Sequence, residues 1–314
     1  MRPTAPSPLQ LPVRLLPVDA VIVAVCAGAS LALLSPWGRW APGAARSAAG
    51  FGVLALGPLL LRWLQARAPQ SRTLRLLASF WMLPVAGLAH TLLNPLVDAV
   101  GHPLYDAQLA QLDAHLLGVQ FALWAEQHGP RWLEDVLLVC YYGHFVWSLV
   151  LAGALYARAE RRAFETFLLA VSVYLAANYA LYALVPAVGP RFFLAAHFAE
   201  PLRGLWLAPR LAGLMMLPAF LRDCFPSGHT GLALLVLITA WRRARGVFWV
   251  ALAPCAGLIA ATLVGRFHYA VDLAAALPLA CGVAAAAEAL YRRLPDTEGA
   301  VARAEPGVPE SEPQ

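Results

Sequence analysis

Long apolar runs separated by short, arginine-bearing turns make up most of this chain. Most of the runs approach the ~20 residues that an α-helix needs to cross ~30 Å of hydrocarbon. The pattern predicts an all-α, polytopic membrane helix bundle of about eight spans, with a range of six to eight because the first two runs are the least certain. The sixth run is short, so its start is expected below the membrane surface. The runs cover residues 18–36, 48–66, 74–97, 132–156, 163–185, 228–241, 247–264 and 270–291.

Polar, proline-containing ends bound a single membrane-embedded domain. Residues 1–17 are rich in proline and are expected to be disordered. Residues 294–314 carry several acidic side chains among prolines, which is typical of a disordered tail. The domain between them covers residues 18–293, with a core at about 75–291.

Arginines in the short turns predict the orientation of the bundle. The turns near residues 62–75, 158–162 and 242–245, and the end at 292–293, fall on one side of the alternating spans. Basic residues are enriched in cytoplasmic loops, so both termini are expected in the cytoplasm. The protein is expected in the plasma membrane. The loop 186–227 breaks this bias, since it contains four arginines yet is expected outside.

Composition supports the membrane prediction and excludes other classes. Hydrophobic residues make up 60% of the 314 positions and charged residues only 13%, about half of what soluble domains carry. The net charge of +5 comes from arginines clustered between apolar runs, so the bilayer rather than nucleic acid is the expected partner. Five scattered cysteines support neither a disulfide framework nor a zinc knuckle.

The second expected external segment, at about 98–131, has its own helical pattern. Leucines repeat at helical spacing from Leu109 to Leu117, beside Asp106 and Asp113. This pattern predicts an interfacial amphipathic helix lying along the membrane. Two roles remain open for it: a cap on the bundle, or a wall of a lipid entry path.

A helix start with a histidine lies where the loop 186–227 meets the sixth run. The residues there read Phe-Pro-Ser-Gly-His, in which Pro226 and Gly228 favour a turn and Ser227 is a good N-cap. The backbone N–H groups and the dipole of a helix N-terminus suit a phosphate. His229 is expected to project from the first helical turn into the same place.

Helix counting brings a second histidine to that face. From His229 the chain runs through one span, turns at 242–246 and returns through the next span to His268. Asp272 follows four residues later, so it shares a helix face with His268. A carboxylate there would bond one ring nitrogen and make the other a better nucleophile.

Two arginines at the same level complete a candidate phosphoryl-transfer site. Arg191 follows the fifth span, and Arg266 precedes His268 by two residues. They are expected to bind the phosphate oxygens together with Ser227 and Gly228 at the helix start. One histidine would attack phosphorus and the other would protonate the leaving oxygen.

Several of these residues also have simpler interpretations. His90 and His144 are interpreted as packed, hydrogen-bonded side chains within spans, although Tyr141 and Tyr142 make the surroundings of His144 unusually polar. Arg266 alone could be an interfacial anchor.

A histidine-based metal site is a weaker alternative. Only His229, His268 and Asp272 are plausible ligands, and Arg266 beside them would repel a cation. We therefore expect neither a metal nor another cofactor.

Two motifs resemble signatures of a known family. Pro226-Ser227-Gly228-His229 is similar to the second signature of the type-2 phosphatidic acid phosphatase superfamily, which includes vanadium haloperoxidases. His268 and Asp272 match the end of its third signature. With Tyr269, the His-Tyr-x-x-Asp form resembles the branch containing inositol phosphorylceramide and sphingomyelin synthases. Residues 105–113 and 189–191 are similar to bacterial members of this inositolphosphotransferase-like branch, and the resemblance covers roughly 75–291.

The resemblance implies a mechanism. His268 would form a phosphohistidine, Asp272 would orient it, and His229 would act first as acid and then as base, without a metal. The chain departs from the family in having no lysine for the first signature and Thr262 where the third has an arginine. Arg191 and Arg266 are the expected substitutes, and the departure favours the phosphotransferase-like branch.

Two functions of different class follow from these patterns. The first is a membrane phosphatase or phosphotransferase acting on a phospholipid or on an isoprenoid- or sphingolipid-type phosphate, with water or an alcohol as the acceptor. The second is a non-catalytic lipid-binding or lipid-transport protein on the same fold. The lipid, the acceptor and the oligomeric state are left open by the sequence.

Overall fold

The computed structural model describes residues 15–200, 202, 204–210 and 222–294, and these residues contain helices but no strand. The expected disordered ends, 1–17 and 294–314, lie outside the described residues except for the few that adjoin the first and last helices. In chain order the helices are α1 (Pro17–Leu34), α2 (Ala44–Arg67), α3 (Arg72–Phe80), α4 (Met82–Thr91), α5 (Asn94–Val100), α6 (Asp106–Leu117), α7 (Phe121–His128), α8 (Arg131–Tyr142), α9 (His144–Ala157), α10 (Arg161–Leu184), α11 (Pro190–Phe193), η2 (Ala195–His197), α13 (Gly228–Arg243), α14 (Arg245–Val264) and α15 (Ala270–Arg293).

The prediction of an all-α membrane bundle is confirmed, with a smaller count of spans. Five helices among the described residues are long and apolar enough to cross a membrane, namely α1, α2, α10, α14 and α15. Two bent pairs, α4 with α5 and α8 with α9, raise the number to seven. The remaining expected span forms α13, whose 16 residues are too few to be counted as a span by length.

The two bent spans break where the sequence disfavours a continuous helix. The axes of α4 and α5 differ by 54°, and Pro95 in the first turn of α5 has no N–H to continue the ladder of α4. The axes of α8 and α9 differ by 46°, and the break falls at Gly143. Each expected apolar run is therefore helical, but these two change direction inside the bundle.

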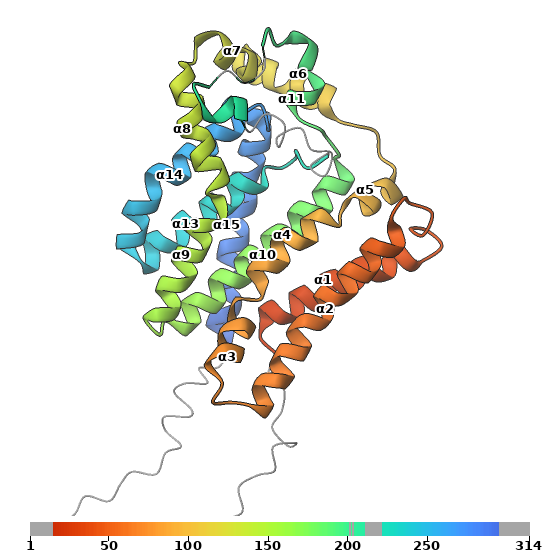
Figure 1. The fold of residues 1–314 in the computed structure, drawn as a ribbon, viewed down its shortest axis with the longest axis vertical. Helices are drawn as coiled ribbons and strands as arrows, with labels where there is room; N and C mark the ends of the chain where they lie inside the picture. The colour runs from red at the N-terminus through yellow and green to blue at the C-terminus, as the bar shows by residue number, and fades with distance from the viewer. Residues whose placement is uncertain (1–14, 201, 203, 211–221, 295–314) are drawn as a thin grey trace, which may run out of the picture.

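The helices form a central bundle with a hairpin at its side and a cap at one end (Figure 1). α10, α13 and α15 pack together, and α14 lies between α13 and α8. α1 and α2 form an antiparallel hairpin that packs on α10 and on α4 and α5. The short helices α6, α7 and α11 cover the end at which α13 and α15 begin (Figure 1).

The opposite end of the bundle gathers the arginine-bearing turns. Arg242 pairs with Glu288 at 2.8 Å, and Arg162 donates to the carbonyl of Tyr291. Arg62 pairs with Asp19 at 2.8 Å, which ties α2 to the start of α1. The sequence expectation that these turns share one side is confirmed by these contacts. We call this the arginine end.

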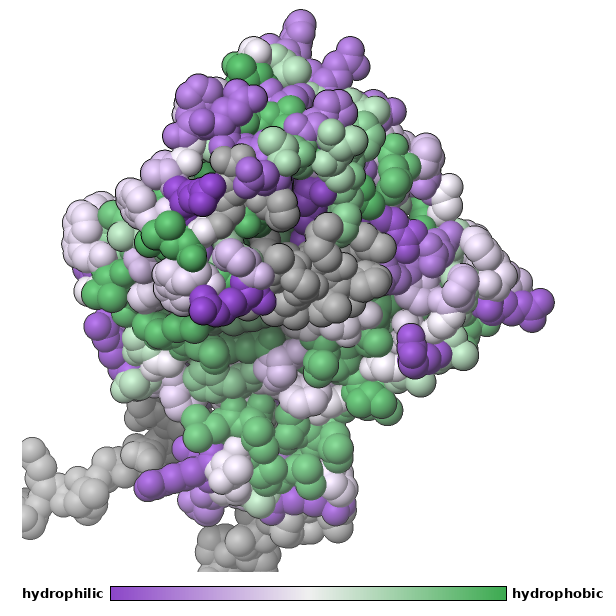
Figure 2. All heavy atoms as spheres, turned by 45° about the horizontal axis from the view of Figure 1, so that its top comes forward, coloured by the Kyte–Doolittle hydropathy of each residue, from purple (hydrophilic) through white to green (hydrophobic). Residues whose placement is uncertain are grey.

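The flanks of the bundle expose apolar side chains. Leu31, Val53, Trp249 and Val250 each have more than 60% of their surface exposed. Figure 2 shows apolar surface along the flank and more polar residues on the cap above it. Exposed apolar surface on this scale is unusual for a soluble monomer and suits contact with lipid tails.

Candidate active site

The turn before α13 is fixed by side chains of α10. Ser227 caps α13 by accepting a hydrogen bond from the N–H of Thr230, as expected from the sequence. Its carbonyl accepts from the hydroxyl of Tyr174 at 2.9 Å, and the carbonyl of Pro226 accepts from Asn178 at 2.7 Å. A side chain at position 228 would come within 3.0 Å of α10, so glycine is needed for this close approach. The helix start that presents His229 is therefore held rigidly.

His268 lies buried beside Asp272, with one ring nitrogen committed. Nδ1 is 2.8 Å from the carbonyl oxygen of Cys224 and 3.3 Å from Oδ2 of Asp272. Both neighbours are hydrogen-bond acceptors, so Nδ1 carries the proton and Nε2 keeps its lone pair. His268 is 4% exposed and Asp272 0%, so the pair is shielded from competing water. The contact predicted between these two side chains is present, and the orienting role of Asp272 stays a prediction.

The two histidines of the motifs meet at this end of the bundle. The ring centroids of His229 and His268 are 6.1 Å apart. Tyr141 stacks on His229 at 4.6 Å and on Phe267 at 4.1 Å. The shared face predicted from helix lengths is thus confirmed, and an aromatic wall from α8 supports it.

His144 belongs to the same cluster as His229 and His268. The interpretation of His144 as a packed side chain did not include this position. Its ring lies 4.7 Å from that of His229, in an edge-to-face arrangement. Nδ1 of His144 is 2.8 Å from the carbonyl of Tyr141, so Nε2 is the nitrogen left for other contacts. The polar residues at 141–144 within an apolar run were the sequence signal for the place of His144 in this cluster.

Arg191 reaches the site from a tight turn. Gly189 has a φ of +83°, and a side chain there would meet the carbonyl oxygen of Phe267 at 2.5 Å. The N–H of Arg191 donates to the carbonyl of Arg266 at 2.8 Å, which joins the two loops. The guanidinium lies 5.0 Å from the centre of the Phe267 ring and acts electrostatically on His229. The phosphate role of Arg191 stays a prediction with which this placement is compatible.

Arg266 points toward the cap instead. Its guanidinium pairs with Glu126 of α7 at 3.1 Å and donates to the carbonyl of Glu200 at 3.0 Å. It also lies 3.8 Å above the ring of Phe198. Arg266 has a φ of +63°, so its backbone adopts a left-handed conformation that residues other than glycine rarely adopt. Arg266 therefore joins its own loop to the loop at 198–200 and to α7. This structural role differs from the phosphate contact that the sequence predicted.

The amphipathic segment 98–131 forms two helices, α6 and α7, rather than one, and α6 braces the site. Asp106 accepts from the N–H groups of Val188 and Gly189 and from the hydroxyl of Tyr269. Asp113 accepts from the N–H groups at positions 270 and 271, at the start of α15. Burial and the nearby carboxylates raise the pKa of Tyr269, so its hydroxyl keeps its proton and donates to Asp106. The capping role left open by the sequence is thus the one that these contacts support.

Carboxylates of α7 and α8 hold the loop above the site in the same way. Glu126 accepts from the N–H groups at positions 199 and 200, and Glu134 from that of Gly204. Asp135 accepts from four consecutive N–H groups at positions 205–208. The five acidic side chains Asp106, Asp113, Glu126, Glu134 and Asp135 will be called the cap carboxylates.

A second histidine–aspartate pair borders the site. Nε2 of His90 is 3.2 Å from Oδ2 of Asp223, the residue before Cys224. Burial opposes ionisation of Asp223, but the hydrogen bond and charge of His90, with Arg191 and His268, lower its pKa below the ordinary value. His90 is therefore packed against tyrosines and hydrogen-bonded, as the sequence interpretation expected. The sequence carried no signal for this contact, since its partner lies 133 positions away.

One group of donors at the site could hold a metal ion. Ligand atoms of Cys224, His268 and Asp272 lie within 4.8 Å of one another, whereas His229 is not part of this group. In the structure Sγ of Cys224 is 3.0 Å from Asp272, and burial together with Asp272 raises the pKa of the thiol well above its usual value. A protonated thiol is a poor metal ligand, so these residues fit a hydrogen-bonded triad better than a metal centre.

Thr262 occupies the position at which the family signature has an arginine. Its side chain is fully buried and donates to the carbonyl of Ile259 at 2.7 Å. Its carbonyl accepts from the N–H groups of Phe267 and His268, each at 3.0 Å. This position therefore supports the loop of His268 through the backbone and contributes no positive charge.

The fold and the histidine geometry together define a membrane-embedded enzyme of the phosphatase type. A family model for the PAP2 superfamily matches residues 107–286, and the chain belongs to this superfamily. PAP2 denotes the type-2 phosphatidic acid phosphatases that the two motifs resemble. Neither the curated proteins nor the solved structures yielded a match to the chain. The superfamily supports phosphatase-type chemistry on a phosphorylated, lipid-type substrate.

Proposed function

We propose that the protein is a lipid phosphatase or phosphotransferase that works through a phosphohistidine on His268. The observation that carries this proposal is the bonding of His268, whose Nδ1 faces two acceptors while Nε2 keeps its lone pair. A neutral imidazole held in one tautomer is the form that attacks phosphorus. The ring centroids of His229 and His268 are 6.1 Å apart, so a phosphoryl group bound at His268 would lie close to His229.

The first step transfers the phosphoryl group to the enzyme. Nε2 of His268 forms a bond to phosphorus as the bond to the leaving oxygen breaks. His229 donates a proton to that oxygen, so the product leaves as a neutral alcohol. Asp272 stabilises the positive charge that develops on the His268 ring. In the second step His229 takes a proton from the acceptor hydroxyl, whose oxygen bonds to phosphorus and releases His268.

The phosphate in this proposal is bound by Arg191 and by the start of α13. N–H groups at positions 228 and 229 have no partner within the helix, because they belong to its first turn. Together with the helix dipole and Ser227 as N-cap, they favour an anion. Arg266 contributes by fixing the loop of His268 against Glu126 and not by contacting the phosphate.

The acceptor in this proposal is an alcohol, as in inositolphosphotransferase-like enzymes. The proposal is supported by the His-Tyr-x-x-Asp form at 268–272 and by the burial of His268 and Asp272 beneath the cap. A site with little access to bulk water favours transfer to a bound hydroxyl. The site end is proposed to face outside the cell, with the arginine end in the cytoplasm.

The test uses the full chain purified in detergent and returned to lipid vesicles. Phosphate release and head-group exchange are measured on a panel of lipid phosphates, with His268→Ala and His229→Ala as variants. His268→Ala is expected to lower turnover by about 10³-fold or more, and His229→Ala by about 10²–10⁴-fold. The matched control is His115→Ala, an exposed histidine of α6, which is expected to keep wild-type activity.

A trapped intermediate distinguishes this proposal from a lipid-binding protein on the same fold. Brief incubation with labelled substrate is expected to give an acid-labile phosphoenzyme in the wild type and none in His268→Ala. Full activity of both histidine variants on an accepted substrate would refute the assignment. Unchanged activity after treatment with a chelator is also expected, since the nucleophile is a side chain.

A further inference from the structure

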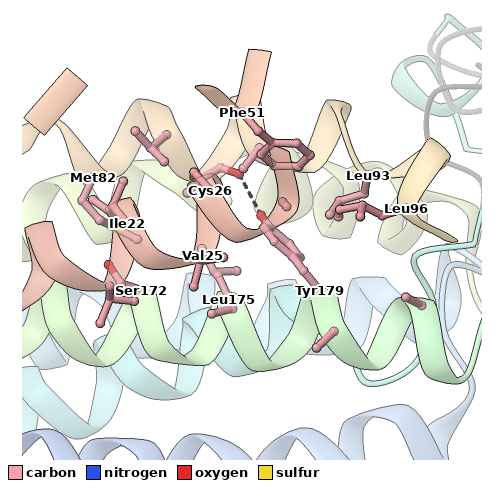
Figure 3. Close-up of a pocket in the computed structure, with 18 of the residues that line it drawn as sticks. Ile22, Val25, Cys26, Phe51, Met82, Leu93, Leu96, Ser172, Leu175 and Tyr179 are labelled. Atoms are coloured by element: carbon pink, nitrogen blue, oxygen red, sulfur yellow. Dashed lines mark hydrogen bonds between the residues drawn. The ribbon is translucent and has the colours of Figure 1, made fainter. Parts of the chain in front are cut away.

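An apolar pocket opens beside the site between the N-terminal helices and α10 (Figure 3). It has a volume of about 250 Å³. Its walls come from α1, α4, α5 and α10 with Phe51 of α2, and none of the described residues that line it is charged. Ile22, Met82 and Leu175 are typical of the lining. An apolar pocket of this kind excludes a polar ligand and accepts hydrocarbon.

The pocket is elongated along α10. Its lining on this helix runs from Ser172 to Ala183, eleven residues later. At 1.5 Å per residue this corresponds to about 16 Å. Figure 3 shows Ser172 near one end and Tyr179 nearer the end formed by Leu93 and Leu96. A lining of this length suits an extended hydrocarbon chain.

The end of the pocket at Tyr179 adjoins His90, which borders the site. The Tyr179 ring is 5.9 Å from the ring of His90, and Ala89 of the lining precedes His90 in α4. His90 bonds Asp223 at 3.2 Å, and the next residue, Cys224, accepts from His268. His90 and Asp223 therefore lie between this end of the pocket and Cys224, and a hydrocarbon chain attached to a phosphate at His268 would reach the pocket past them.

The pocket is built from helices inside and outside the family match. The family match begins at residue 107, so α10 belongs to the matched region, while α1, α2, α4 and α5 precede it. The break between α4 and α5 turns Leu93 and Leu96 toward the pocket, at the end near the site. The N-terminal helices therefore add a binding surface to the catalytic core.

We propose that this pocket binds one hydrocarbon chain of the substrate and sets the preferred chain length. The proposal rests on the proposed function, since it assigns the phosphate of the same molecule to His268. Three observations support it: the apolar lining, the length along α10 and the continuity with the site through His90. The substrate class is a phosphate ester of a lipid with at least one long unbranched or isoprenoid chain.

The kinetic test compares esters with the same head group and chains of increasing length. In the wild type, KM is expected to fall with chain length and to level off once the chain fills the pocket. Ala176→Phe places a ring in the middle of the lining and is expected to lower the preference for the long over the short ester, taken as the ratio of kcat/KM values, by about tenfold. Ala253→Phe, at an exposed position of α14, is the matched control and is expected to keep the wild-type ratio. An unchanged ratio in Ala176→Phe would overturn the proposal.

A binding test separates this inference from the proposed function. A lipid phosphate with a photoreactive group in its chain is cross-linked to His268→Ala in vesicles, and the labelled peptides are mapped. Label is expected on α1 and α10, reduced by Ala176→Phe and competed by the unlabelled long-chain phosphate. Equal competition by a diacylglycerol without phosphate would mean that bulk lipid fills the pocket, and this inference would then fail. Absence of turnover with correct labelling would instead refute only the proposed function.

Discussion

At the scale of single residues, catalysis depends on the proton of the His268 ring. Asp272 and the Cys224 carbonyl both accept at Nδ1, which leaves one tautomer. The carbonyl belongs to the backbone, so only the carboxylate can be tested by substitution. An amide at position 272 could donate to Nδ1 and favour the opposite tautomer.

Asp272→Asn is therefore expected to lower kcat by about 10²–10⁴-fold with a small change in KM. The measurement is steady-state turnover of the best lipid phosphate. Cys224→Ser keeps a donor toward Asp272 and the same backbone carbonyl, and it serves as the control, with activity expected within a few-fold of wild type. Wild-type turnover by Asp272→Asn would show that the carboxylate does not orient His268.

The pair His90 and Asp223 gives the protein a specific response to acid. The pKa of Asp223 is lower in the folded protein than its ordinary value of ~3.9. In the pH range between these two values the unfolded chain binds more protons than the folded one, so stability rises with pH there. The stabilisation is complete above the ordinary pKa and is lost as the pH falls toward the folded value.

Asp223→Asn is expected to be less stable than wild type at pH 6, and the difference is expected to shrink as the pH falls below about 4. The melting temperature of the detergent-purified protein, measured from pH 6 down to pH 3, checks this. A difference that is constant over the whole range would show that the loss comes from packing and not from ionisation of Asp223.

At the scale of elements, α13 and α10 approach closely at a glycine. A Cβ at Gly231 would lie 1.8 Å from the ring of Tyr174, and Tyr174 is fully buried. The ring cannot move without losing its hydrogen bond to the carbonyl of Ser227. The position of the catalytic turn therefore depends on this contact.

Gly231→Ala is expected to destabilise the protein by about 1–3 kcal/mol through overpacking, despite the better helix propensity of alanine. Gly282→Ala is the matched control, because this exposed glycine of α15 has nothing within 4 Å of the added Cβ. The control is expected to be neutral or slightly stabilising. Thermal unfolding of both variants gives the comparison, and equal stability of the two would contradict the packing argument.

At the scale of the whole molecule, the arginine end and the end that holds His229 and His268 lie on opposite sides of the bundle. Positive residues in short turns remain on the cytoplasmic side. A fluorescent protein fused after the last residue is therefore expected to fold and fluoresce in a bacterial host. Alkaline phosphatase inserted in the turn 101–105, before α6, is expected to be active, because this enzyme needs an oxidising compartment. The opposite pattern of the two reporters would invert the proposed orientation.

The sequence predicted the large features because they are periodic or local. Apolar runs of spanning length located the helices, and the alternation of spans brought His229 and His268 to one end. Ser227 was recognisable as an N-cap from its neighbours alone. The breaks at 92–93 and at Gly143 were not predicted, because a proline or a glycine within an apolar run is also compatible with a continuous membrane helix.

Other contacts of the site could not be read from the sequence for physical reasons. Arg266 sits beside His268 in sequence, yet its charge is neutralised by Glu126, 140 positions earlier. His90 finds Asp223 across a similar distance. Asp135 binds backbone N–H groups, which every residue but proline provides, so its partners leave no pattern in the sequence.

The cap carboxylates have a consequence for how this protein can vary among its relatives. They hold residues 188–189, 199–200, 204–208 and 270–271 through main-chain amides, so the contact requires no particular side chain except at Gly189 and Gly204, where the close approach leaves no room for one. We expect an alignment of homologues to show variable residues at 199–200 and 205–208, with the five acidic positions and these two glycines conserved. Substrate preference could then diversify by loop replacement without rebuilding the catalytic end, which makes these loops the natural place to engineer acceptor specificity.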